Sequence, residues 1–271
     1  MKRPNGHFII QSNARRPTPD EIADYLEQTW QTFRDLFGVE PPPVKVVISL
    51  TSGGGAVSAQ ADQERAAGLS EHLMPWAIKE GEGITHQTFS DLSHEITHIY
   101  FIGYMEDKGG LHQAHAWLHE AVACHSERDP YRKNREQWAR DHLNDRIPLK
   151  QLFAMKNPQK YNPLVELTVE LHQKLARGEI KVEALNRQIS EFATTHAGEL
   201  SQAGIKNMTY YSESLSVFEF LLMTEGKAFI RRMCQSLKKG KTMDQIIRTL
   251  KTYPKGIAQL EDAWAAHTQG A

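Results

Sequence analysis

Two histidines and a glutamate near the middle of the chain have the spacing of a catalytic zinc site. His94, Glu95 and His98 form the pattern His-Glu-x-x-His within residues 84–102. Apolar residues recur in this stretch at helical spacing, and residues four apart lie on the same side of a helix. Both imidazoles can therefore reach one tetrahedral metal ion, and the carboxylate beside the first can act on a water molecule there. The pattern predicts a Zn²⁺ site if the chain supplies a third ligand.

A catalytic zinc ion takes three protein ligands and keeps one position open. In one family of zinc proteases the third ligand is a histidine six residues after the second one. Here Tyr104 occupies that position, and Phe101 stands where that family has a glycine. This arrangement is therefore excluded. The alternative to a metal site is a surface helix that carries two histidines by chance.

A second predicted helix, residues 111–128, carries a glutamate that faces inward. At 100° per residue, Glu120 falls in one sector with Trp117, Cys124 and Glu127. Cys124 is better explained as a small packed side chain than as a ligand. Of the four histidines of this helix, His119 is the best placed for metal binding, but all four lie at the margin of that sector or point away from it: His112, His115, His119 and His125.

Two segments resemble the glutamate-type zinc metallopeptidases, the thermolysin-like group, and within that group the peptidase MA-like proteins. The first is HEITH at residues 94–98. The second is WLHEAVA at residues 117–123, which is similar to the WLNEGFA segment of zinc aminopeptidases. The resemblance implies that His94, His98 and Glu120 bind Zn²⁺ and that Glu95 is the general base.

A third segment, YSES at residues 211–214, looks like a Tyr-x-x-Ser segment of the same proteins, where it opens a helix. The resemblance implies that Tyr211 donates a hydrogen bond to the oxyanion of the reaction, with Tyr210 and Ser214 behind it. The alternative is a buried tyrosine that only supports the C-terminal helices.

The chain departs from this family at two places. Thermolysin-like enzymes often have an acidic residue four positions after the glutamate ligand, where this chain has Cys124. Glu127, one helical turn further on, could replace it. The chain also lacks the Gly-x-Met-Glu-Asn segment with which aminopeptidases hold a free amino terminus, so an endopeptidase is expected.

The overall charge of the chain gives no sign of a polyanionic partner. Its 32 Lys and Arg residues balance 33 Asp and Glu residues, with a net charge of -1. We therefore expect neither nucleic acid nor an anionic membrane to bind. No apolar run has the length of a signal peptide or a membrane span. The chain as given is expected to be soluble and cytoplasmic, with an exported mature form as the alternative.

Strand and helix signals predict an α+β fold, and the resemblance implies that it is of zincin type. Residues 1–103 are expected to form a lobe with a small mixed β-sheet that ends in the His-Glu-x-x-His helix. Its strands are predicted at residues 7–11, 44–50 and, at the edge, 73–78. Residues 104–271 are expected to form a mainly helical lobe that carries the third zinc ligand, with the substrate cleft between the lobes.

These features together predict a zinc-dependent metallopeptidase that hydrolyses a peptide or protein substrate. The alternative is a catalytically degenerate zincin fold that acts as a metal-stabilised binding or regulatory module. The intact Glu95 favours the enzyme, because a purely structural zinc site has four protein ligands and needs no general base. The sequence gives no indication of the oligomeric state.

Overall fold

The computed structural model describes residues 7–12, 18–41, 44–51, 72–79, 86–105, 115–156 and 163–270. Most of these residues are helical. The strands are β1 (Phe8–Ser12), β2 (Val44–Thr51) and β3 (His72–Lys79). The helices, with one short 3-10 turn at Leu143–Asp145, are α1 (Pro19–Phe37), α3 (His86–Met105), α4 (Ala116–Ser126), α5 (Tyr131–Asp141), α6 (Leu149–Ala154), α7 (Pro163–Ala176), α8 (Val182–Thr195), α9 (Ala197–Lys238), α10 (Met243–Ile247) and α11 (Ile257–Gly270).

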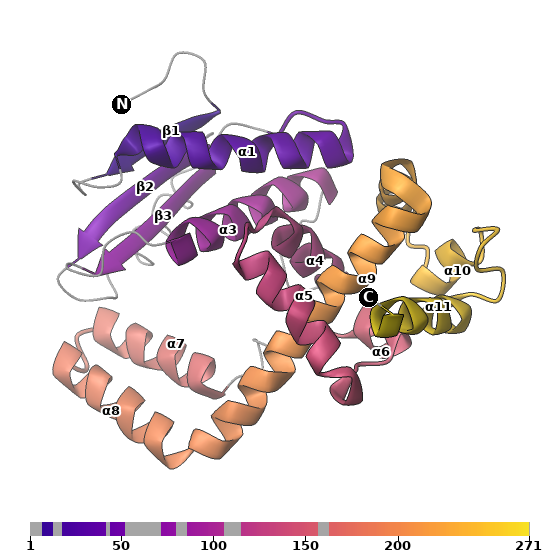
Figure 1. Cartoon of the computed structure of the whole chain (residues 1–271). Coiled ribbons are helices and arrows are strands. Elements are labelled where there is room, and N and C mark those ends of the chain that lie inside the picture. The colour runs from indigo at the N-terminus through magenta and orange to yellow at the C-terminus, as the bar shows by residue number, and fades with distance from the viewer. Residues whose placement is uncertain are drawn as a thin grey trace.

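The predicted fold class, α+β with a small mixed β-sheet lobe, is wrong. The three strands pair in the order β1-β2-β3, and both pairings are parallel. The helix that carries the two histidines, α3, packs mainly on the helices α1, α4 and α9. Figure 1 shows these helices as one body beside the small sheet. Strands do form at the three predicted places, but the body around the candidate site is helical.

Helix ends follow the local sequence. Thr18 accepts a hydrogen bond from the backbone of Glu21, and the Glu21 side chain accepts one from the backbone of Thr18, so α1 begins with the predicted capping box. Gly38 ends α1 with φ 70°, a left-handed conformation that glycine adopts without strain. The predicted capping box of Thr242 and Gln245 likewise begins α10.

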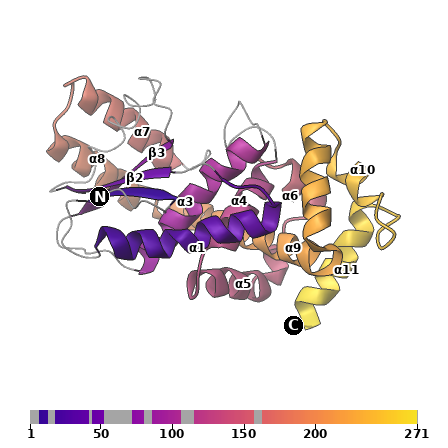
Figure 2. The same ribbon diagram turned by 90° about the horizontal axis from the view of Figure 1, so that it is seen from above.

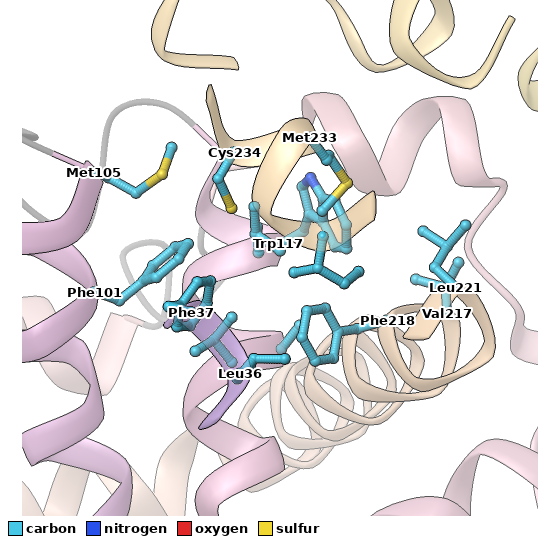
Figure 3. Packing of buried hydrophobic residues seen from close by; sticks show 14 of the residues in the cluster. Leu36, Phe37, Phe101, Met105, Trp117, Val217, Phe218, Leu221, Met233 and Cys234 are labelled. Atoms are coloured by element: carbon cyan, nitrogen blue, oxygen red, sulfur yellow. The ribbon is translucent and has the colours of Figure 1, made fainter. Parts of the chain in front are cut away.

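Helix α4 is the centre of the hydrophobic core. Every residue from Ala116 to Cys124 is buried, because α3 packs on one side of this helix and α9 on the other. Figure 3 shows Trp117 of α4 among side chains of α1, α3 and α9, including Phe37, Phe101 and Phe218. Of the second predicted helix, residues 111–114 lie outside the described part of the chain.

Helix α9 is longer than the sequence predicts. Tyr211 does not open a helix, because α9 already begins at Ala197. The helix is interrupted at Gly226, whose φ of 77° and ψ of 170° are not helical. The two parts of α9 therefore run in different directions, with Tyr210 and Tyr211 in the first part.

The helices at the two ends of the molecule are well separated. In Figures 1 and 2 the pair α7 and α8 lies at one end, and α10 and α11 lie at the other. Within the described residues, no helix combines the length and the apolar character that crossing a membrane requires. The predicted lobe boundary at residues 103 and 104 falls in the last turn of α3, and the division into two lobes stays a prediction.

Candidate metal centre

Three predicted ligands from two neighbouring helices converge on one point. The Nε2 atoms of His94 and His98 are 3.1 Å apart, as expected for residues one turn apart on α3. Oε2 of Glu120, on α4, lies 3.2 Å from the first nitrogen and 3.4 Å from the second. The structure therefore places all three donor atoms at the corners of one small triangle.

The size of this triangle suits a zinc ion. Zinc bonds of about 2.0–2.1 Å in a tetrahedron separate the ligand atoms by about 3.3–3.4 Å. The observed edges of 3.1 to 3.4 Å are close to that value. The donor set of two imidazoles and one carboxylate is also one that zinc prefers at catalytic sites. Both the geometry and the chemistry of these residues fit the metal.

Burial gives a second reason to expect a cation here. Glu120 is only 2% exposed and lies in the helix at the centre of the core. A buried carboxylate costs several kcal/mol unless it is paired or binds a metal. Burial alone would raise the pKa of Glu120, but the adjacent imidazoles of His98 and His94 outweigh burial and lower it. The site is therefore built to hold a charged carboxylate.

A chain of polar contacts holds the first histidine in place. Nδ1 of His94 donates to Oε1 of Glu127 at 2.8 Å. Glu127 in turn accepts two hydrogen bonds from Arg135 of α5, at 2.6 Å from Nε and 2.7 Å from Nη2. A proton on Nδ1 leaves the lone pair of Nε2 free for a metal. Glu127 thus supplies the supporting carboxylate that is missing at Cys124, as the sequence suggests. Arg135 in turn holds Glu127 in place.

A second group of possible metal donors lies at the other ring nitrogen of His94, Nδ1. It consists of His94, Glu127 and Cys124, whose Sγ lies 4.0 Å from Nδ1 of His94. Both oxygens of Glu127 are already bonded to Arg135, so a cation is present there without a metal. Burial raises the pKa of the Cys124 thiol and so disfavours the thiolate that metals require. Of the two groups, the one that contains Glu120 is therefore the better candidate for a metal.

Glu95, the predicted general base, is exposed between two buried neighbours, His94 and Ile96. It follows the first histidine directly on α3, so it leaves the same turn of the helix. Glu95 is therefore open to solvent, as a base that acts on water must be.

Tyr211 lies next to the donor triangle. Its ring centroid is 6.0 Å from that of His94, and the guanidinium of Arg135 lies 5.2 Å from the Tyr211 ring. Tyr210 is fully buried beside it, and its hydroxyl has no hydrogen-bond partner among the described residues. Burial raises the pKa of Tyr210, and the charge of Glu120 adds to this rise. Tyr210 is therefore a protonated donor at neutral pH.

Other histidines of α4 are not part of the triangle. The ring of His119 is buried against Phe101 at 4.8 Å and lies 6.5 Å from the ring of His98. His125 contacts Glu219 of α9 at 3.1 Å, on another face of the helix. His115 stands before the first turn with φ 61°. His112 lies outside the described residues.

Sequence reasoning missed Arg135. Residues 132–141 mix positive and negative charges, which is typical of a solvated helix face. The structure turns Arg135 inward, to Glu127 and Tyr211, while Lys133, Asn134 and Gln137 of the same helix are exposed. The available signal was weak: a basic residue eight positions after an acidic one, across a helix break.

Comparison of the chain with protein-family models, with curated proteins and with solved structures finds no match.

Proposed function

We propose that the protein is a zinc-dependent peptidase in which His94, His98 and Glu120 hold the metal. The observation that carries this proposal is the triangle of their three donor atoms, with edges of 3.1 to 3.4 Å. When bound, Zn²⁺ acts as a Lewis acid and brings the pKa of water at the site toward neutrality.

Three further residues have roles that follow from their positions. Glu95, exposed beside His94, accepts a proton from the attacking water and passes it to the leaving amine. Tyr211 donates a hydrogen bond to the oxygen that becomes negatively charged. Glu127, fixed by Arg135, keeps the proton of His94 on Nδ1. The substrate is a peptide or protein chain.

The decisive experiment compares two glutamate variants of the full chain. Glu95→Gln should keep one equivalent of zinc and lose about 100-fold or more in hydrolysis of an unfolded protein. Glu120→Ala should lose the metal. Zinc content is measured by mass spectrometry, and cleavage is measured on casein with and without a chelator. A Glu120→Ala protein that still holds zinc tightly would refute the ligand set.

A metal-stabilised module without activity is the competing function. It predicts that Glu95→Gln changes nothing that can be measured, and that the unmodified protein, loaded with zinc, cleaves no peptide library.

Tyr211→Phe tests the assignment of the oxyanion donor. It removes only the hydroxyl, so we expect turnover to fall about 100-fold with zinc content unchanged. Tyr210→Phe is the matched control because it removes a neighbouring hydroxyl. If only the control lowers turnover, the donor is Tyr210.

A further inference from the structure

The balanced charge of the chain conceals one strongly basic segment. Residues 227–255 contain nine Lys or Arg residues and one acidic residue, Asp244, whereas the whole chain has a net charge of -1. These residues form the second part of α9, helix α10 and the turn before α11. Figures 1 and 2 show them at the end of the molecule opposite α7 and α8. We call this surface the cationic end.

Four of the nine positive charges of the cationic end are available to a partner. Lys239, Lys241, Lys251 and Lys255 are all exposed, and no ion pair of the described residues includes any of them. The single acidic residue is already engaged, since Asp244 pairs with Arg248 at 2.6 Å.

An apolar cavity opens within this surface. It has a volume of about 730 Å³ and lies between α6, α10 and α11. Its lining includes the apolar residues Phe153, Met243 and Ile257, together with Lys150 and Lys255. Glu261, also in the lining, already accepts a hydrogen bond from the backbone of Leu149. The cavity therefore combines an apolar interior with unpaired positive charge, which suits an anionic amphiphile.

We infer that the cationic end binds anionic lipid membranes, with the apolar cavity taking part of one acyl chain. Lysine clusters are attracted to anionic headgroups, and each Lys or Arg near the surface contributes about a fivefold gain in binding. A single-stranded nucleic acid would need exposed aromatic rings for base stacking. The aromatic residues of the segment, Phe229 and Tyr253, are both buried, so the lipid surface is favoured.

Vesicle co-sedimentation of the full chain tests this inference. Vesicles of phosphatidylcholine alone are compared with vesicles that contain one third phosphatidylserine, at low and high salt. The triple variant Lys239→Glu, Lys241→Glu, Lys251→Glu should bind the anionic vesicles about 100-fold more weakly. The matched control is Lys181→Glu, Arg187→Glu, Lys206→Glu, which changes the net charge equally on exposed positions at the N-cap of α8, within α8 and in the first part of α9. The control should bind like the unmodified protein.

A variant in the cavity tests the contribution of the acyl chain to binding separately from that of the headgroup. Ala258 lines the cavity and is exposed, so Ala258→Trp fills the space without disturbing the core. We expect about tenfold weaker binding to anionic vesicles with an unchanged salt dependence. Unchanged binding would refute the role of the cavity.

Three results would overturn the inference as a whole. One is the absence of binding to anionic vesicles, and another is an equal loss in the charge-reversal variant and its control. The third is tighter binding of single-stranded RNA than of vesicles, lost in the charge-reversal variant. Circular dichroism and thermal unfolding confirm that each variant is folded. Zinc loading and hydrolysis do not enter these measurements, so the result is independent of the proposed peptidase activity.

Discussion

Two clusters in this molecule have the same three residue types and very different surroundings. In one, Glu127 bonds both His94 and Arg135 of α5. In the other, Glu219 contacts both His125 and Arg132 of the same helix α5, each at 3.1 Å. We call them the inner cluster and the outer cluster. The glutamate side chain is 4% exposed in the inner cluster and 23% exposed in the outer one.

The difference lies in what surrounds the histidine. In the inner cluster the far nitrogen of His94 meets His98 and Glu120, so one side of the ring binds a carboxylate and the other is free for a metal. Among the described residues, no metal-binding group includes His125. A His-Glu-Arg set is therefore no indication of a metal site by itself. Burial and a second set of donors are what distinguish the inner cluster as a candidate metal site.

The largest contrast is expected for removal of the histidines. His94→Ala should weaken zinc binding about 1000-fold, because it removes one of three ligands from a total affinity on the order of 10 kcal/mol or more. His125→Ala should leave zinc binding unchanged. Competition with a fluorescent chelator measures both affinities. Equal losses would erase the proposed distinction between the clusters.

The arginines should differ in their effect on stability. Arg135→Met leaves the charge of Glu127 buried and without its cation, which costs about 3 kcal/mol. Arg132→Met removes a cation that is 38% exposed, and should cost about 1 kcal/mol or less. Urea unfolding of the zinc-free proteins gives both values. A larger loss for Arg132→Met would contradict the burial argument.

Substitution of the glutamate in each cluster should affect zinc affinity differently. Glu127→Gln keeps the shape of the side chain but weakens its bond to the ligand His94, and should reduce zinc affinity about 10-fold to 100-fold. Glu219→Gln, its counterpart in the outer cluster, should not change the affinity. A visible spectrum of the cobalt-loaded proteins reports whether the ligand geometry shifts in the first variant only.

The smallest expected effect is on how the free energy of unfolding depends on pH. Burial opposes a charge on His94, but its contacts with Cys124, Glu120 and Glu127 outweigh burial and raise its pKa. The zinc-free protein therefore gains stability from this group below its ordinary pKa of about 6.5, and loses it as pH rises through the raised value. The slope is at most about 1.4 kcal/mol per pH unit. Unfolding measured across neutral pH should show this loss in the unmodified protein and in His125→Ala, but not in His94→Ala.

Local sequence signals predicted much of the candidate site. The spacing of His94 and His98 requires only that their segment be helical, and the inward sector of Glu120 follows from the same periodicity. Their convergence is a finding, while the metal and the catalytic roles remain proposals. The capping boxes at Thr18 and Thr242 were equally readable, because a cap depends on residues three positions apart.

Features that depend on tertiary packing could not be predicted in this way. β-Branched runs indicate strands, but they do not say that the histidine helix α3 packs mainly on other helices, so the fold class was wrong. The inward turn of Arg135 depends on Glu127 and Tyr211, which belong to other helices. The net charge of the chain also does not reveal the cluster of lysines at the cationic end, because a sum over all residues carries no information about their positions.

The break at Gly226 joins the two proposals in one helix. The part of α9 before it carries Tyr210 and Tyr211 beside the candidate metal centre, and the part after it begins the cationic end. If the protein docks on a lipid surface, the direction of this break sets the height and tilt of the candidate metal centre above the headgroups. A single glycine would then determine which substrates come within reach, those embedded in the bilayer or those dissolved above it.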